Sequence, residues 1–396
     1  MNRHSRHVLT AKQITRSADF IAHQQQPDGE IPWERGGKSD PWDHVHAAMG
    51  LAVAGRLPEA KRAFRYLADT QDEIGGWPAE RQAGRVVNGA RETNHAAYVA
   101  TGLWYLQQAS PDQAFLAEMW PMIDRAIDFV VSMQDSRGAI SWAVNDRGRV
   151  WGAPLITGSS SIHGSLVCAL RIAETLGHAR PHWQRARRRL ASVLQHRREH
   201  FDDTDLPNRP GRYSMDWYYP VLGGAVRGLA AWRRLFHPEL TQRFVTEGVG
   251  CRCVDDRPWY TVAESGELVL ALDAVGLTLR ARQILDWLSP LRTRRGGYWT
   301  GRTHPDGELY PHGEQTAWTA ATVLLADDAV ARESTTSAFF RDLASDGHVE
   351  PEAHTVMAFM KPSTSPRPEV RQRRRNTPSV LVVGSASKSP DARARR

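Results

Sequence analysis

FIAHQQQPDGEIPW, which runs from Phe20 to Trp33, is the first of four stretches that share one pattern. In each stretch a helix-like segment ends in a polar residue, and a turn from Gly to Trp follows. The other three are LADTQDEIGGW (Leu67 to Trp77), VVSMQDSRGAISW (Val130 to Trp142) and LSPLRTRRGGYW (Leu288 to Trp299). Gly supplies a backbone conformation that ends a helix, and Trp gives the next loop an apolar anchor. An internal repeat of this kind indicates an array of similar helical units.

Helical segments on either side of these turns fall into six pairs. The first member of each pair is amphipathic, and the second is small, apolar and sparsely charged. We expect the first members at 13–25, 58–71, 119–134, 182–201, 238–246 and 278–289, and the second members at 42–54, 93–107, 160–175, 216–232, 264–275 and 314–326. A helix that is apolar nearly all round should be buried. The pattern therefore predicts an all-α fold, an (α/α)6 toroid or six-hairpin barrel in which outer helices enclose inner ones and strands are few and short.

The 396-residue chain consists of a nearly neutral body and a basic end. Residues 361–396 carry ten Lys or Arg and two acidic residues, so their net charge of +8 accounts for the +7 of the whole chain. We expect one closed domain over 1–330, an appended helical segment over 331–360 that packs on the outside, and a disordered basic tail over 361–396. A neutral body does not favour a nucleic-acid partner.

Several classes of protein are disfavoured by what the sequence lacks. The N-terminus has no apolar core of a secretory signal and no window reaches about 18 apolar residues, so we expect a cytoplasmic protein without a membrane span. The cysteines, Cys168, Cys251 and Cys253, are odd in number and lack a second pair at zinc-site spacing. Phosphate-binding loops, dinucleotide fingerprints and metal-helix motifs are also missing, so we expect no metal and no cofactor.

The segments that lead into the inner helices are long, polar and rich in Trp and Tyr. In a toroid they all emerge at one end, and a polar residue begins each inner helix there. Helix capping explains any one of these residues. Six of them beside so many aromatic rings instead suggest a site for a sugar chain, because glycoside hydrolysis needs two carboxyl groups and sugar rings stack on flat aromatic faces.

Longer strings in the same segments resemble a family of actinobacterial proteins that usually carry the genome label prenyltransferase or squalene-cyclase-like. These strings are SDPWDHVHAAMGLA (Ser39 to Ala52), GRYSMDWYYPVLGGA (Gly211 to Ala225), GCRCVDDRPWYTVAESGELVLALDA (Gly250 to Ala274) and GGYWTGRTHPDGELYPHGEQTAWTAA (Gly296 to Ala321). The resemblance covers about residues 15–327. The family is similar to methylmannose polysaccharide hydrolases, endo-acting enzymes that cut an intracellular α-(1→4)-linked 3-O-methylmannan in mycobacteria and their relatives.

The resemblance implies a mannan-cleaving glycoside hydrolase with Asp43 and Glu264 as its catalytic carboxylates. Each begins an inner helix beside aromatic residues that would raise a carboxyl pKa. We expect an inverting mechanism, which needs roughly 6.5–9.5 Å between the two carboxyl groups, and leave the roles of acid and base unassigned. The expected sugar contacts are Glu30, Trp42, His46, Asn94, His95, Asp216, Tyr218, Arg257, Trp259 and Glu314, of which Asp216 and Glu314 are also reserve carboxylates.

Two other functions stay open at this point. A terpene cyclase or prenyltransferase would share the helical repeats, but the string from Asp202 to Asp205 has the wrong order for the acid of a class II cyclase. Asp255-Asp256 and Asp327-Asp328 each lack the third aspartate of a class I enzyme. A non-catalytic toroid that binds a ligand or partner on its rim is also compatible with the composition.

Overall fold

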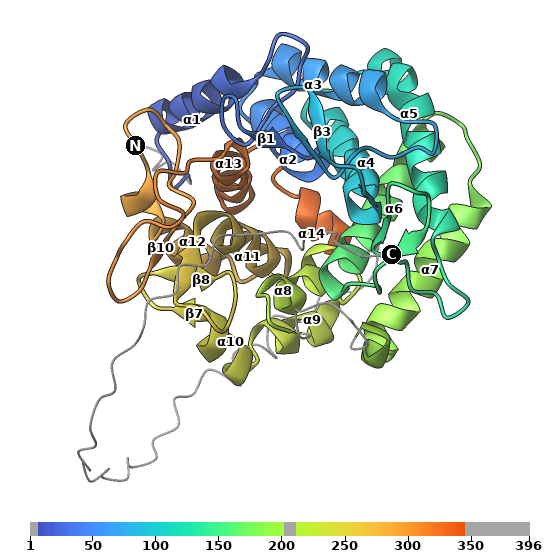
Figure 1. Ribbon diagram of the computed structural model, residues 1–396. Helices are drawn as coiled ribbons and strands as arrows, with labels where there is room; N and C mark the ends of the chain where they lie inside the picture. Colours follow the sequence, from blue (N-terminus) through green and yellow to red (C-terminus); the bar gives the residue numbers. More distant parts are fainter. Residues whose placement is uncertain (1–6, 202–210, 345–396) are drawn as a thin grey trace, which may run out of the picture. The chain divides into compact units, whose positions relative to one another are not determined.

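The helices of the chain form two concentric rings in the computed structural model, which describes residues 7–201 and 211–344 (Figure 1). Outer and inner helices alternate along the sequence, which confirms the predicted (α/α)6 toroid. The predicted tail at 361–396 lies outside the described residues. The expected domain boundaries at residues 330 and 360 stay predictions.

The inner ring is continuous. Each inner helix packs on the next, and the last returns to the first, where a Cβ atom on Gly50 would lie only 2.6 Å from the Cβ of Ala321. Most residues of these helices are buried, as their apolar composition predicts. The inner helices are α2 (Pro41–Val53), α4 (Thr93–Ala109), α6 (Ile156–Thr175), α8 (Met215–Leu222), α11 (Val262–Ala274) and α13 (Ala317–Ala331).

The outer helices bury one face each against the inner ring. They are α1 (Ala11–Gln24), α3 (Leu57–Thr70), α5 (Gln113–Ser132), α7 (Pro181–His196), α9 (Gly228–Leu235), α10 (Pro238–Phe244) and α12 (Thr278–Asp286). Two 3-10 turns, η1 (Arg198–Phe201) and η2 (Ser289–Leu291), follow α7 and α12. No described helix is long and apolar enough to cross a membrane.

The Gln-to-Trp repeats are joints between successive outer helices. The side-chain Nε2 atoms of Gln25, Gln71 and Gln134 each donate to the carbonyl of the turn glycine four residues on. Each Nε2 also donates to a backbone carbonyl of the next outer helix, on α3, α5 and α7 respectively. In the fourth repeat Arg292 replaces glutamine and donates to the Gln13 carbonyl of α1 at 3.4 Å. This last joint links the final outer helix to the first.

The turn glycines are required by close approach as well as by conformation. All four have positive φ angles, between +92° and +105°, and lie against the backbone of the next outer helix; they are Gly29, Gly75, Gly138 and Gly296. At the closing joint, a Cβ atom on Gly296 would lie 2.1 Å from the carbonyl oxygen of Arg16 in α1. Ser17 of α1 also donates to the Gly296 carbonyl at 2.8 Å. Any larger residue would push the two outer helices apart.

The predicted fourth inner helix, at 216–232, is wrong. The structure ends α8 at Leu222 and begins a separate outer helix, α9, at Gly228. A Cβ atom on Gly223 would lie 2.0 Å from the Ser160 carbonyl oxygen, so α6 packs directly on this backbone. Gly224 has a φ angle of +69° and faces the Leu343 carbonyl, which turns the chain out of the inner ring.

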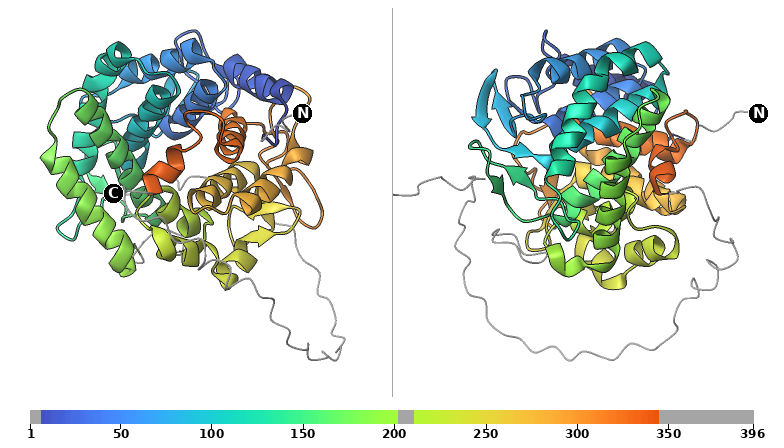
Figure 2. Two further views of the ribbon diagram at one scale, coloured as in Figure 1. Left: turned by 180° about the vertical axis from the view of Figure 1, so that it is seen from behind. Right: turned by 90° about the vertical axis from the view of Figure 1, so that its right-hand side faces the viewer.

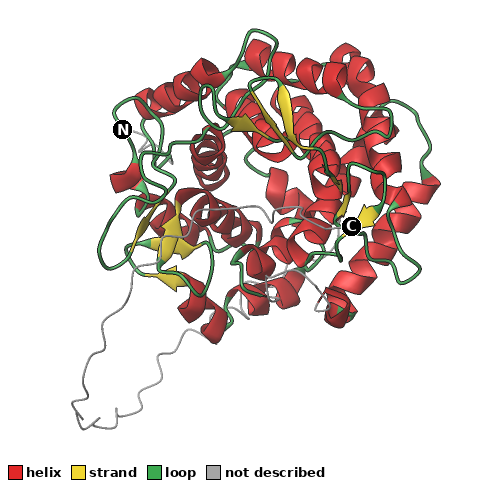
Figure 3. Ribbon diagram, in the orientation of Figure 1, coloured by secondary structure: helices red, strands yellow, loops and turns green. Residues whose placement is uncertain are grey.

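The strands are short, as expected, and form three antiparallel sheets (Figure 3). The first sheet contains β1 (Lys38–Ser39), β2 (Glu80–Gln82) and β3 (Arg85–Asn88), and the second β4 (Arg91–Glu92), β5 (Ala143–Val144) and β6 (Val150–Trp151). The third contains β7 (Val245–Thr246), β8 (Gly250–Arg252), β9 (Trp259–Thr261) and β10 (Gly301–Thr303). Since β1, β4 and β9 lead directly into α2, α4 and α11, these sheets lie at the end of the ring where the inner helices begin.

The opposite end of the ring is closed by α14 (Phe339–Ala344), which lies across the ring from the strands of the first two sheets (Figure 2). We expected the segment after residue 330 to pack on the outside of the toroid. Instead α14 contacts the inner helices α8 and α11, and the ring of Phe339 meets that of Tyr105 from α4. Arg341 bonds the carboxylate of Asp273 in α11, which fixes α14 in place.

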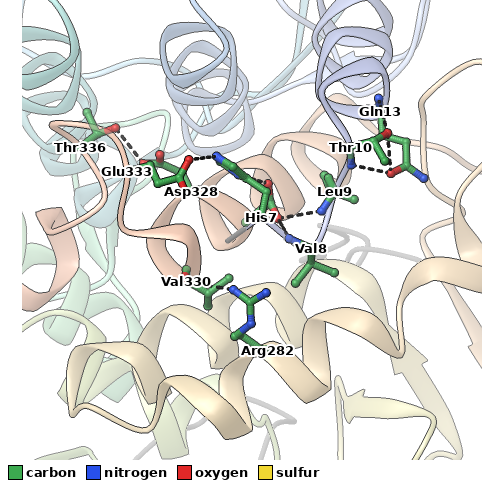
Figure 4. Close-up of polar contacts among 11 residues, drawn as sticks. His7, Val8, Leu9, Thr10, Gln13, Arg282, Asp328, Val330, Glu333 and Thr336 are labelled. Carbon is green, nitrogen blue, oxygen red and sulfur yellow. Dashed lines mark hydrogen bonds and ion pairs between the residues drawn. The ribbon is translucent and has the colours of Figure 1, made fainter. Parts of the chain in front are cut away.

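The N-terminal segment is anchored at α13. The backbone N–H groups of Val8 and Leu9 donate to one carboxylate oxygen of Asp327 at 2.7 and 3.0 Å. His7 Nδ1 lies 2.7 Å from the other oxygen, and Figure 4 shows how this segment leads into α1. The neighbouring Asp328 accepts from the hydroxyl of Thr336 at 2.8 Å. Both aspartates of the Asp327-Asp328 pair are therefore bonded to protein groups.

Substitution of Gly296 should test whether the contact between this turn and α1 stabilises the folded ring. We expect Gly296→Ala to lower the free energy of unfolding by about 3 kcal/mol or more, because the new methyl group meets the α1 backbone in a left-handed conformation. Gly276→Ala is the matched control, since Gly276 has a φ angle of +82° with nothing within 4 Å of its Cβ position. It should cost only about 1 kcal/mol. Equal losses in denaturant unfolding would contradict the proposed joint.

Candidate active site

Asp43 lies in the first turn of α2 and is not the residue that caps this helix. The cap is Asp40, whose Oδ1 accepts from the N–H of Asp43 at 2.9 Å. The Asp43 side chain is only 6% exposed, and its Oδ2 atom has no hydrogen-bond partner. Capping thus leaves Asp43 unexplained, and a buried carboxyl oxygen without a partner is a candidate for contact with a ligand.

Glu264 occupies the same position in the first turn of α11, and is also 6% exposed. It follows strand β9 directly. The thiol of Cys253 lies beside its carboxylate: burial raises the pKa of Cys253, and the charge of Glu264 raises it further. All three cysteines are buried and unpaired. Glu264 therefore sits in an apolar, weakly solvated position at the start of an inner helix.

Asp43 and Glu264 belong to one cluster of acidic groups. Burial raises the pKa of Asp43 well above its usual range, and the charges of Asp40, Glu267 and Glu264 raise it further against a lowering by Lys38. The charge of Glu264 thus acts on Asp43 although the two residues are far apart in sequence. A carboxyl group in these surroundings favours its protonated form.

Glu267 is a third acid of this cluster that our sequence reasoning missed. It is fully buried and accepts hydrogen bonds from the hydroxyls of Tyr218 and Tyr219, both at 2.7 Å. Burial raises the pKa of Glu267 to about 8, in spite of the two tyrosine hydrogen bonds. The signal in the sequence is its spacing, because a residue three positions after Glu264 lies on the same face of the helix.

The imidazole of His46 in α2 lies close to the carboxyl group of Glu267 in α11. Its Nε2 atom lies 3.8 Å from Glu267 Oε1 and 3.1 Å from the hydroxyl of Tyr98. Burial lowers the pKa of His46 to about 3, so the imidazole is neutral at pH 7. At neutral pH the approach of His46 to Glu267 is therefore a contact between two uncharged side chains, not an ion pair.

Aromatic rings enclose the acids. Trp42 stacks on Tyr98 with ring centroids 4.0 Å apart, and its ring also lies 5.9 Å from Tyr219 and 6.4 Å from His95. These rings come from α2, α4 and α8. Of the predicted sugar contacts, the structure brings Trp42, His46, His95 and Tyr218 into the cluster, although the hydroxyl of Tyr218 is already bonded to Glu267.

Further unpaired polar atoms lie in the first two turns of the inner helices. Among the described residues, buried side-chain atoms without a hydrogen-bond partner include Asp43 Oδ2, Asn94 Oδ1, His95 Nδ1, Ser161 Oγ and Trp318 Nε1. They come from four helices: α2, α4, α6 and α13. Each such atom costs about 1–3 kcal/mol unless a ligand or water satisfies it. Their number at one end of the ring supports a site for a molecule rich in hydroxyl groups.

Two reserve carboxylates are bonded to protein groups. Asp216 accepts from Thr157 Oγ1 at 2.7 Å and from the N–H of Gly211 at 3.2 Å. Glu314 lies before α13 and accepts from Thr300 Oγ1 at 2.8 Å. Among the described residues, no hydrogen bond or ion pair links either side chain to the cluster of Asp43, Glu264 and Glu267, and their roles stay predictions.

Three other predicted sugar contacts also lie apart from the cluster. Glu30 accepts from Ser39 Oγ of β1 and from the hydroxyl of Tyr66 in α3. Trp259 is half-buried on β9, where its Nε1 donates to the Tyr310 carbonyl at 2.9 Å, and Arg257 is exposed in the turn before it. Their roles in sugar binding stay predictions.

A pH series should test the state of Glu267. Below about pH 8 the folded chain keeps this proton, whereas the unfolded chain releases it at the usual glutamate pKa of 4.5. Wild-type stability should therefore fall by about 2–4 kcal/mol relative to Glu267→Gln as the pH rises from 4.5 to 8, and level off above pH 8. The measurement is denaturant unfolding across this range.

Glu308→Gln is the control, because it removes one carboxylate from the surface. A stability difference between wild type and Glu267→Gln that stays constant with pH would show that folding does not raise the pKa of Glu267.

Comparison with solved structures supports the fold. The chain superposes on a D-mannose isomerase with a TM-score of 0.64 over 81% of this chain and 96% of that one, at 10% identity. It superposes on a wild-type glycosidase with a TM-score of 0.60 over 85% and 97%, at 17% identity, and on a sugar epimerase from a ruminal bacterium with a TM-score of 0.61 over 80% and 98%, at 12% identity. At these identities the likeness shows the fold alone.

Comparison with known sequences goes further. No family model matches the chain. The chain is, however, 44% identical over 334 residues to the MMP endo-(1,4)-3-O-methyl-alpha-D-mannosidase of Mycolicibacterium hassiacum. The matched region covers 84% of this chain and 90% of that protein. The chain therefore belongs to the family of this mannosidase and is a glycoside hydrolase.

Proposed function

We propose that this enzyme cuts internal α-(1→4) bonds of a 3-O-methylated mannan, the substrate for which its relative is named. The observation that carries the proposal is the joint burial of Asp43 and Glu264 at one end of the ring, in a chain 44% identical to that relative. We place this activity in the cytoplasm as part of the proposal, since the resemblance implies an intracellular substrate.

Asp43 is the general acid in this proposal. Burial raises its pKa well above the usual range, and the neighbouring acids raise it further, which favours the protonated form that a general acid needs. Its unpaired Oδ2 atom is available to a ligand. The proton passes from Asp43 to the glycosidic oxygen as the bond between that oxygen and the anomeric carbon breaks.

Glu264 is then the general base. It takes a proton from a water molecule, whose oxygen attacks the anomeric carbon from the face opposite the leaving group. The product therefore carries an inverted anomeric configuration. Asp43 is left ionised and Glu264 protonated, and exchange with water restores both. The neutral His46 and the tyrosine-bound Glu267 contact each other within this cluster and take no part in the proton transfers.

The terpene cyclase or prenyltransferase alternative receives less support. Such enzymes need aspartates directed at a ligand, but Asp327 and Asp328 bond the N-terminal segment and Thr336. Asp256 pairs with Arg212 at 3.0 Å. The string from Asp202 to Asp205 lies outside the described residues. The non-catalytic toroid that the sequence left open is disfavoured as well, because the chain belongs to the family of a mannosidase.

A substrate panel tests the activity and its stereochemistry. We expect the purified protein to shorten 3-O-methylmannan from within the chain and to act weakly or not at all on unmethylated and β-linked mannans. NMR of the first sugar ends released should show the β-anomer, as inversion at an α-linkage requires. Release of the α-anomer would contradict the inverting mechanism, and absence of any cleavage would contradict the function.

Substitution of the two acids tests their roles. Asp43→Asn and Glu264→Gln should each lower kcat on the polysaccharide by about 10²–10⁴-fold, whereas the surface variant Glu308→Gln should match wild type. An aryl glycoside with a good leaving group needs little protonation. Asp43→Asn should therefore keep most of its activity on such a substrate while Glu264→Gln does not. The reverse order would exchange the two roles.

A further inference from the structure

Exposed apolar side chains gather on two hairpins at the end of the ring where the inner helices begin. Val86 and Val87 of β3 are 51% and 58% exposed, and Val150 and Trp151 of β6 are 61% and 42% exposed. The two hairpins project from the same side of the helices (Figure 2). The two hairpins also touch each other. Gly89 follows β3 and Asp146 lies between β5 and β6, and a Cβ atom on Gly89 would lie 3.4 Å from the Cβ atom of Asp146. Isolated apolar residues are common on surfaces, whereas exposed apolar residues on two hairpins that touch are candidates for a binding surface.

Trp151 forms a fixed aromatic pair with Trp142. Their ring centroids are 5.1 Å apart at an interplanar angle of 32°. Gly152 admits this arrangement, because a Cβ atom there would lie 2.9 Å from the Trp142 ring. Trp142 Nε1 donates to Glu92 Oε2 at 2.9 Å, which holds the indole in one orientation. The pair, which we call the indole platform, is thus a rigid surface with one half-exposed ring.

A short series of neighbouring side chains leads from the indole platform to the candidate active site. Glu92 Oε2, which holds Trp142, also lies 3.4 Å from His95 Nε2. The ring of His95 lies 6.4 Å from that of Trp42, the residue before Asp43. A sugar chain bound at Asp43 that leaves the ring along α4 would therefore pass over the platform.

We propose that Trp142 and Trp151 form a remote subsite for O-methylated sugar residues of the substrate, beyond those at the bond that is cut. The inference rests on the proposed function. A 3-O-methyl group replaces a hydroxyl with an apolar cap, so that one edge of each sugar prefers contact with apolar side chains over water. Indole faces and the neighbouring Val150 supply such contacts, and an endo-acting enzyme must hold chain on both sides of the bond.

The test compares Trp151→Ala with Leu279→Ala by steady-state kinetics. Leu279 lies on the outer helix α12 and is 83% exposed, so it controls for the loss of an exposed apolar side chain elsewhere. The substrates are purified 3-O-methylmannan and an unmethylated α-(1→4)-mannan of similar length. We expect Trp151→Ala to raise KM for the methylated chain about tenfold with kcat within about twofold, and Trp151→Phe to restore most of the affinity.

Two results would overturn the subsite. One is a KM for the methylated chain that changes no more in Trp151→Ala than in Leu279→Ala. The other is an equal loss of affinity for methylated and unmethylated chains, measured by calorimetry where the unmethylated chain is not cut. Wild type that cuts neither chain would contradict the proposed function instead. Calorimetric binding of the methylated chain to wild type and Trp151→Ala would then still decide the platform.

Discussion

The contact between a turn glycine and the backbone of the next outer helix is the constraint on which the ring depends. At Gly296 this contact joins the end of the toroid to α1, across 280 residues of sequence. Without closure, α2 and α13 would lose their shared interface and the inner helices would be left partly exposed. Closure also packs α2 on α13, which in turn packs on α11, so the first turns of α2 and α11 come near enough for the charge of Glu264 to act on Asp43.

The features that could be predicted from the sequence are those that depend on the spacing of apolar and polar residues within one helix. Amphipathic and wholly apolar helices alternate in the sequence, so the two rings follow from helical periodicity. The choice of Asp43 and Glu264 among the polar residues that begin inner helices rests on the family resemblance, with which their place at the start of apolar helices agrees. The break between α8 and α9 could not be found in this way. Gly223 and Gly224 resemble ordinary glycines in an apolar run, and only the backbone of Ser160 and Leu343 excludes a continuing helix there.

Side-chain direction explains the other differences between the site predicted from the sequence and the site in the structure. Glu267 was missed because an acid in an apolar helix has meaning only with its partners, Tyr218 and Tyr219, which lie on another helix. Conversely, Glu30 and Asp216 belong to the polar loops and helix starts that the composition singles out, yet their carboxylates bond Ser39 and Thr157. The sequence indicates which segments meet at one end, but not which side chains of those segments face one another.

Buried acids have different partners at the two ends of the inner helices. At the α14 end, Asp273 bonds Arg332 and Arg341, and Asp327 accepts backbone N–H groups, so each charge is compensated. At the other end, Asp43, Glu264 and Glu267 form no ion pair with an arginine or lysine among the described residues, and the nearest histidine is neutral. Buried acids without a cation destabilise a fold unless protons are shared among them. Clusters of buried acids with raised pKa values are typical of catalytic sites. In the proposed mechanism this arrangement lets Asp43 give a proton to the glycosidic oxygen and Glu264 take one from water.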